Sequence, residues 1–171
     1  GATGEQYLLV GDIPETRENV RNGGAHYRFL CEPVDPHDPF RGKYIVLTFA
    51  AERYEGALDT AAFPEGSWAK ALLDTDEEGF AIVTSLEKEP VPGRDHIDVE
   101  VVRWMPDGGA RLHFPFDRFY MDEELAGPAE TVFRESLRDT ASRTWADVDV
   151  RDGIAVMREV RIDGVPIRER I

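Results

Sequence analysis

Apolar and polar residues alternate with a period of two along much of the chain. Tyr27, Phe29 and Cys31 occupy every second position of one stretch, which predicts a half-buried β-strand. Residues 44–50 are almost continuously apolar, which predicts a central strand that is covered on both faces. Further strand patterns occupy residues 68–73, 80–86, 96–104, 110–116, 144–150, 154–162 and 165–167.

Turn-forming residues join several of these strands in pairs. The acidic stretch 74–79, the Pro- and Gly-containing stretch 105–109 and the Gly-containing stretch 151–153 each separate two neighbouring strand patterns. Connections this short predict β-hairpins, and the strands of a hairpin run antiparallel. The chain therefore contains eight or nine expected strands, most of them paired with a neighbour in sequence.

One helix is expected, at about residues 128–139. Gly127 suits the N-cap and Pro128 the first helical position, and the negative charge of Glu130 complements the helix dipole. Apolar residues then recur at helical spacing. We therefore predict a mostly β fold, made of antiparallel sheets or a partly open barrel with one short α-helix, in a single domain over residues 1–171.

The charge of the chain restricts its partners. The formal net charge is −14, and only three of the twenty basic residues are Lys. A surface of this sign repels nucleic-acid phosphates and anionic lipid headgroups, so we expect neither as a direct partner. Acidic residues with few Lys are typical of proteins that stay soluble in concentrated salt, although a GC-rich genome would also favour Arg over Lys.

Cys31 is the single cysteine, which excludes a disulfide within the chain, and its strand pattern predicts a small buried hydrophobe. Trp68, Trp104 and Trp145 are spread over three expected strands, and we interpret them as core anchors rather than as a ligand cage. No run approaches the roughly 18 apolar residues of a membrane span, so we expect the chain itself to be soluble.

Two acidic segments contain residue types that can hold a metal. Asp35, His37 and Asp38 lie in a proline-rich loop that includes Pro36, and acidic residues alternate in the stretch 74–79. Aspartates beside prolines more often cap backbone amides, and the second stretch lacks the spacing of a calcium loop. We favour a structural role for both segments and expect neither a metal nor a cofactor.

Tyr120, Asp122, Glu123 and Glu130 gather around a turn and the expected start of the helix. Paired carboxylates can act as general acid and base, which makes these four residues a candidate binding site. Capping of the helix and simple exposure to water also explain them. The serines lie outside any Gly-x-Ser-x-Gly elbow, so we assign no catalytic residue.

Residues 32–49 resemble the signature of the bacterial GDYXXLXY family, in which an Asp- and Pro-containing loop leads into Arg-Gly-Asp-Tyr and then a strand. The motif positions are occupied here by Arg41, Gly42, Tyr44, Leu47 and Phe49. Lys43 replaces the Asp of the motif. Gly42 permits a positive φ where the loop turns into the strand, and Tyr44 combines an apolar ring with a polar hydroxyl.

The resemblance continues at residues 119–123, which look like an aromatic-Tyr-x-x-Glu element of the family, and at residues 152–167. It implies a bacterial protein with one membrane span near its N-terminus, found together with multi-spanning membrane proteins. We expect any anchor to lie upstream of Gly1 and this domain to lie on the extracytoplasmic face.

The expected function is non-catalytic binding of a protein or ligand, possible partners including a multi-spanning membrane protein. Two alternatives remain open at this point. One is a hydrolase or metal-dependent enzyme that uses the Asp35–Asp38 loop or the Tyr120–Glu123 turn, and the other is a structural subunit of a membrane complex.

Overall fold

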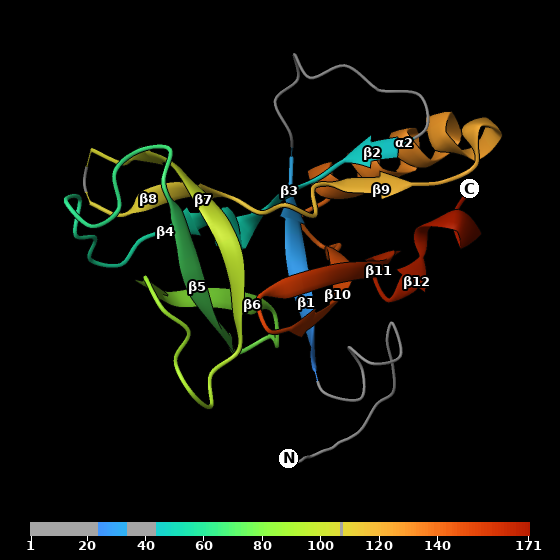
Figure 1. The fold of residues 1–171 in the computed structure, drawn as a ribbon. Helices are drawn as coiled ribbons and strands as arrows, with labels where there is room; N and C mark the ends of the chain where they lie inside the picture. The colour runs from blue at the N-terminus through green and yellow to red at the C-terminus, as the bar shows by residue number, and fades with distance from the viewer. Residues whose placement is uncertain (1–23, 34–43, 107) are drawn as a thin grey trace.

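The computed structural model describes residues 24–33, 44–106 and 108–171, whose strands form two five-stranded sheets and a two-stranded ribbon (Figure 1). The first sheet has the strand order β12-β11-β10-β1-β3, and its pairs are antiparallel. Its strands are β1 (Ala25–Glu32), β3 (Thr48–Phe49), β10 (Thr144–Arg151), β11 (Ile154–Ile162) and β12 (Val165–Pro166).

The second sheet has the order β4-β8-β7-β5-β6 and is also antiparallel. Its strands are β4 (Arg53–Tyr54), β5 (Trp68–Thr75), β6 (Ala81–Glu87), β7 (His96–Trp104) and β8 (Ala110–His113). The ribbon pairs β2 (Tyr44–Val46) with β9 (Arg118–Tyr120). The mostly antiparallel β fold is confirmed, as are the predicted hairpins β5–β6, β7–β8 and β10–β11.

Isolated parallel bridges join the two sheets. Arg28 of β1 pairs with Phe80, just before β6, and Ile97 of β7 pairs with Gly153 in the turn between β10 and β11. The 3₁₀-helix η1 (Ala50–Glu52) connects β3 to β4 and carries the chain from the first sheet to the second. The strands thus curve into a nearly closed barrel, with a gap between β1 and β6 beyond the first bridge.

Arg28 fastens the two sheets together at that bridge. Its guanidinium donates a hydrogen bond to the Glu78 carbonyl at 2.9 Å. The same group lies 5.0 Å from the ring centroid of Phe80 and 5.1 Å from that of Trp145, a cation–π distance to each of two neighbouring rings. Gly79 has a φ of +88°, and a Cβ there would lie 2.4 Å from Arg28 Nη2, so this turn requires glycine.

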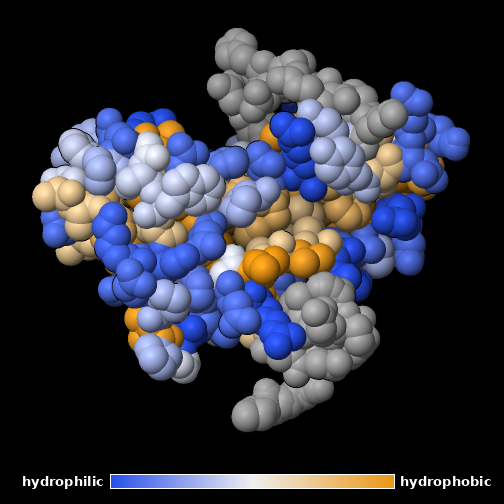
Figure 2. All heavy atoms as spheres, viewed as in Figure 1, coloured by the Kyte–Doolittle hydropathy of each residue, from blue (hydrophilic) through white to orange (hydrophobic). Residues whose placement is uncertain are grey.

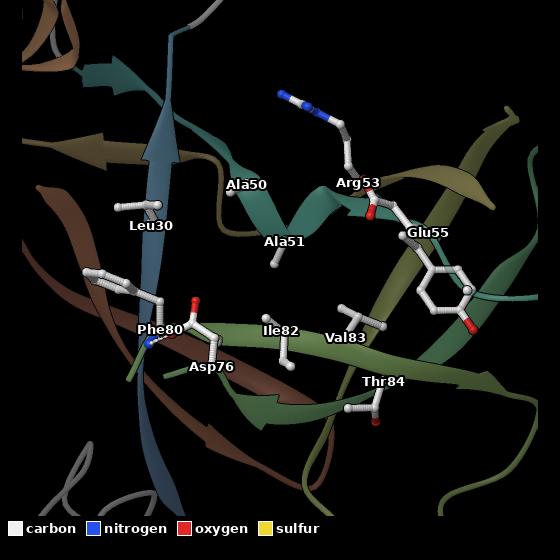
Figure 3. A pocket seen from close by; sticks show the side chains of 13 residues that line it. Leu30, Ala50, Ala51, Arg53, Glu55, Asp76, Phe80, Ile82, Val83 and Thr84 are labelled. Atoms are coloured by element: carbon white, nitrogen blue, oxygen red, sulfur yellow. Dashed lines mark hydrogen bonds between the residues drawn. The ribbon is translucent and has the colours of Figure 1, made fainter. Parts of the chain in front are cut away.

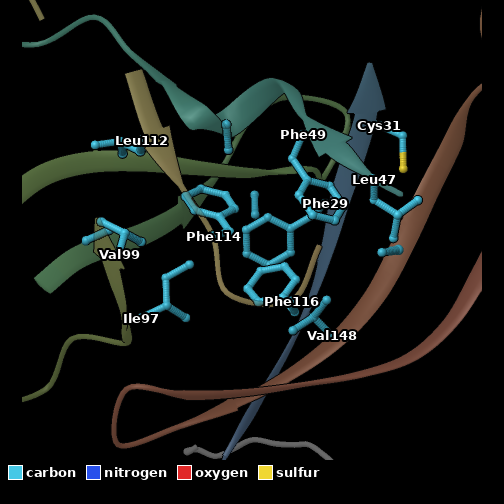
Figure 4. Packing of buried hydrophobic residues seen from close by; sticks show 14 of the residues in the cluster. Phe29, Cys31, Leu47, Phe49, Ile97, Val99, Leu112, Phe114, Phe116 and Val148 are labelled. Atoms are coloured by element: carbon cyan, nitrogen blue, oxygen red, sulfur yellow. The ribbon is translucent and has the colours of Figure 1, made fainter. Parts of the chain in front are cut away.

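The core is centred on a cluster of phenylalanines in the barrel (Figure 4). The Phe29 ring centroid lies 5.9 Å from that of Phe49, 5.6 Å from that of Phe114 and 5.1 Å from that of Phe116, in edge-to-face orientations. Cys31 is buried beside this cluster, as its strand pattern predicted, and burial raises the pKa of its thiol well above the ordinary value.

The helix α2 (Glu123–Arg138), the one α-helix among the described residues, begins five residues earlier than predicted. Asp122 is its N-cap residue, so Gly127 is not the N-cap and Pro128 lies inside the helix. Proline disfavours the α conformation of the preceding residue mainly through a clash with its Cβ, and Gly127 has no Cβ. The Gly-Pro pair that looks like a helix start is therefore accommodated one and a half turns into the helix.

The predicted central strand at residues 44–50 is wrong. The chain breaks at Leu47, whose N–H donates to the Asp117 carbonyl at 2.8 Å, and the flanking strands β2 and β3 join different sheets. Ile45, Leu47 and Phe49 are buried, whereas the residues between them are half-buried. This segment thus covers the core with one face only.

The prediction that the tryptophans are core anchors fails for two of the three. Trp68 is 57% exposed and Trp104 is 42% exposed, although the Trp104 indole donates to the Phe63 carbonyl at 3.0 Å. Trp145 is half-buried and packs against Phe80. Figure 2 shows a largely hydrophilic face with apolar residues gathered in its middle, where β11 lies in Figure 1.

The C-terminal strands end in the 3₁₀-helix η2 (Ile167–Glu169), and Ile167 is fully buried. Within the described residues, none of the helices is long and apolar enough to cross a membrane.

Candidate functional site

The structure describes only part of the predicted motif. Tyr44 and Leu47 are described, whereas five predicted motif positions lie outside the described residues: Asp35, Pro36, Asp38, Arg41 and Gly42. The predicted capping role of the aspartates and the positive φ of Gly42 therefore stay predictions. Leu47 is 2% exposed and belongs to the core, so its role is structural.

Tyr44 and Tyr120 come together on the β2–β9 ribbon, although 75 positions of sequence separate them. They are direct partners in the antiparallel register, and their ring centroids lie 5.1 Å apart. The Arg118 guanidinium lies 4.8 Å from the centroid of the Tyr44 ring. We call these three side chains the tyrosine–arginine patch. Tyr120 is 60% exposed and the Arg118 side chain is 52% exposed, so the patch faces solvent.

The patch is held in place from beneath. Ile45 and Phe119 are partners in the same ribbon, point to its other face and are buried in the core. A hydrogen bond with Tyr120, with smaller contributions from Tyr44, raises the pKa of Arg118 above its ordinary value. The guanidinium is therefore charged, and it contacts both tyrosines in the domain alone.

The other predicted binding residues have separate roles. Asp122 is the N-cap residue of α2, and its carbonyl accepts from the Leu125 N–H at 2.9 Å. Glu123 lies in the first turn, where a carboxylate complements the helix dipole. Glu130 lies beyond the first turn of α2, so it does not complement the dipole at the helix start as predicted. It forms an ion pair with Arg134, one turn further along the helix. Of the four residues, Tyr120 is the one that joins the patch.

A trough runs along the edge of β6 that faces η1 and β4, and Figure 3 shows its first part. Its first part has a volume of about 280 Å³ and is lined by Leu30, Ala51 and Ile82 among others. Its second part, about 500 Å³, reaches Phe63. Tyr54 lines both parts, so they adjoin, and we call them together the β6 trough.

β10 carries a charged cluster that the sequence pattern did not reveal. Asp147 and Asp149 are buried on the face of the first sheet opposite the core, where Arg161 Nε donates to Asp147 at 2.5 Å and Arg158 Nε to Asp149 at 2.7 Å. His26 lies between them, 3.4 Å from Asp147 and 3.1 Å from Asp149. We call these five side chains the β10 ion cluster.

The protonation states in this cluster favour ion pairing. Burial opposes a charge on His26, but hydrogen bonds and charge attraction from Asp147 and Asp149 exceed that effect and raise the His26 pKa to about 9. Burial likewise opposes charge on the two aspartates, yet His26 and the arginines hold the pKa of each below its ordinary value. The cluster is therefore fully ionised at neutral pH.

Glu52 is a second buried carboxylate that the sequence did not reveal. Its two oxygens accept from the Phe49 N–H at 3.0 Å and the Phe114 N–H at 2.8 Å, and Arg111 lies 4.0 Å away. Burial raises its pKa despite these contacts. Glu52 joins η1 to the segment after β8 and has the contacts of a structural group.

Asp76 supports the structural reading of the acidic stretch 74–79. Its Oδ1 accepts from the Glu78 and Phe80 N–H groups, each at 2.9 Å, which closes the β5–β6 turn. In the described part of the chain, no three His, Cys, Asp or Glu side chains are grouped so that they could hold a metal ion.

Comparison with known proteins adds the family. A family model described as GDYXXLXY protein matches residues 6–163. The chain belongs to the GDYXXLXY family. The search of curated proteins and the search of solved structures found no match.

In GDYXXLXY terms, the described motif residues divide between two roles. Tyr44 supplies one ring of the exposed tyrosine–arginine patch, whereas Leu47 and Phe49 are buried in the core. Among the motif side chains that the structure describes, Tyr44 is thus the one that a partner can reach.

Proposed function

We propose that this GDYXXLXY domain is the non-catalytic, extracytoplasmic binding domain of a membrane-anchored bacterial protein. Its partner is a protein, and a multi-spanning membrane protein is the candidate that fits the family. The tyrosine–arginine patch is the contact surface, and its exposure and the contacts among its three side chains are the observation that carries the proposal.

Tyr and Arg are the side chains that dominate binding energy in protein interfaces, together with Trp. The Tyr44 ring lies tilted against the Tyr120 ring and beneath the Arg118 guanidinium, and the buried pair Ile45 and Phe119 supports the ribbon from its other face. Ordering side chains on association costs free energy, and side chains that already contact one another lose less of their freedom when a partner binds.

Charge supports a protein partner over other classes. A net charge of −14 repels phosphate backbones and anionic headgroups, so neither nucleic acid nor an anionic membrane surface is a favourable ligand for the domain. A protein partner with aromatic or carboxylate side chains complements the Tyr rings and the Arg118 charge.

The test uses the full-length protein in membranes, co-expressed with the multi-spanning membrane protein of the same gene neighbourhood. A photo-crosslinking amino acid replaces Tyr120 in one sample and Trp68 in the control, because Trp68 is similarly exposed, at 57%, but lies on the second sheet and not on the β2–β9 ribbon. We expect a crosslink from position 120 and none from position 68.

Two substitutions then test the side chains themselves. Arg118→Ala and Tyr120→Ala should each weaken co-purification of the partner about tenfold, whereas Tyr120→Phe, which keeps the ring, should weaken it less. Equal crosslinking at positions 120 and 68, or full retention of the partner by both alanine variants, would contradict the proposal.

A further inference from the structure

Among the described residues, the gap in the barrel leaves one edge of a strand without a partner along most of its length. β6 is the terminal strand of its sheet and is paired with β5 on one side. On its other side, the described residues supply a single bridge, from Arg28 to Phe80 at the start of the strand. Beyond that bridge β1 diverges from β6, and the β6 trough occupies the space between β6 and η1 (Figure 3).

The backbone of Val83 points into this trough. The Leu73 N–H donates to the Asp95 carbonyl at 2.9 Å, so the backbone of Leu73 is directed toward β7. Val83 is the partner of Leu73 across β5–β6, and the two consequently form a non-hydrogen-bonded pair. The N–H and C=O of Val83 therefore face away from β5, as edge-strand groups that an added strand can use.

The trough walls are apolar at their base. Leu30, Ala50 and Ala51 lie opposite β6 in the first cavity, and Leu58 and Phe63 line the second. The two cavities, of about 280 and 500 Å³, lie one after the other along β6. The side chains on one face of an extended peptide are also spaced along its length, so such a peptide can place side chains in both cavities.

The rim of the trough is negatively charged. Four carboxylates belong to the lining: Glu55, Asp59, Asp76 and Glu87. Arg53 is the basic residue among them, and it donates to Glu32 at 2.6 Å, so its charge is already matched. A cationic occupant complements this rim, whereas an acidic one is repelled.

We propose that the β6 trough is a second binding site, which takes an extended, basic segment of a partner polypeptide as an added strand. The segment pairs through its backbone with the open edge of β6 at Val83. Its apolar side chains enter the two cavities and its Lys or Arg side chains reach the carboxylate rim. This site is independent of the tyrosine–arginine patch.

The probe is a fluorescein-labelled heptapeptide, Lys-Val-Lys-Val-Lys-Val-Lys, followed by fluorescence anisotropy in 0.15 M NaCl. A peptide of the same sequence with N-methylated internal amides keeps the charge but cannot pair as a strand, and a Glu-Val repeat reverses the charge. We expect saturable binding of the first peptide, and binding at least about tenfold weaker for the other two.

The matched protein variants are Val83→Pro, which removes the outward N–H, and Val83→Ala, which keeps it. Proline is tolerated on an edge strand where the N–H is not needed by the sheet. We expect Val83→Pro to weaken peptide binding at least about tenfold and Val83→Ala to change it less than about threefold. If Val83→Pro does not fold, Ala50→Trp, which fills the trough, replaces it with the same expected loss.

Amide hydrogen exchange gives the site of binding. The Val83 amide should exchange fast in the free protein and become at least about tenfold slower with the peptide bound. Equal binding of the N-methylated peptide would indicate charge adhesion only and overturn the proposal. A Val83 amide that is protected before the peptide is added would also overturn it, because another segment of the chain or a second copy would already occupy the trough.

Discussion

His26→Gln removes the cation that lies between the two buried aspartates of the β10 ion cluster. In the folded protein the His26 pKa is raised from 6.5 to about 9, and a full shift of this size corresponds to roughly 3 kcal/mol. The His26 side chain is 50% exposed, so solvent screening reduces that figure, and we expect a loss of about 1–2 kcal/mol in the free energy of unfolding.

The pH dependence follows from the direction of the shift. Because the folded pKa is higher than the unfolded one, the contribution of His26 is fully present below about pH 6.5. It is lost as the pH rises toward 9. Asp147 and Asp149 have lowered pKa values, so their contribution is present above about pH 4 and is lost as the pH falls through the folded values.

Urea unfolding of the parent and of His26→Gln at several pH values measures this effect. The two proteins should differ by about 1–2 kcal/mol at pH 6 and converge by about pH 9.5. His113→Gln is the control, because His113 contacts the single, partly exposed carboxylate of Asp117 at 3.0 Å, and its loss should cost under about 1 kcal/mol. A constant difference between parent and His26→Gln from pH 6 to 9.5 would refute the reasoning.

Three further predictions concern stability. Glu52→Gln should lower the free energy of unfolding by about 1–3 kcal/mol in urea melts, because the amide cannot accept from both the Phe49 and Phe114 N–H groups; an unchanged midpoint would show that these bonds contribute little. Gly127→Ala should destabilise α2 while Pro128 is present, because the new Cβ clashes with the proline. In a Pro128→Ala background the same change should stabilise α2 by about 1 kcal/mol. Thermal melts detect this reversal of sign, and additive effects of the two substitutions would exclude it. The net charge of −14 should make the thermal midpoint rise between low and near-molar NaCl, and a midpoint that stays flat or falls would contradict self-repulsion as a limit on stability.

The elements that the sequence predicted well are those specified by neighbouring residues. The β5–β6 hairpin follows from two strand patterns and a turn that Asp76 and Gly79 close locally. The start of α2 was misplaced for the same local reason, because Gly127 and Pro128 are typical of a helix start. A second start signal lies just upstream, with Asp122 at the N-cap and acidic residues in the first turn, and this is the one that the helix uses.

The functional surfaces depend on distant partners, which a single sequence does not display. Tyr44 was identified from its motif and Tyr120 from a second element, but their contact needed the β2–β9 register. Asp147 and Asp149 alternate with apolar residues on β10, a pattern that indicates a polar face without naming its cations. The β6 trough arises from the divergence of two strands and has no sequence signal of its own.

The acidic rim of the β6 trough also affects whether copies of this protein associate at high concentration. An open strand edge is a template for pairing with an identical edge. Two β6 edges that approached each other would bring two sets of the four rim carboxylates face to face, so like charges keep the copies apart. Salt screens this repulsion. High salt is therefore expected to stabilise the folded chain and, at the same time, to weaken the repulsion that keeps two β6 edges from pairing.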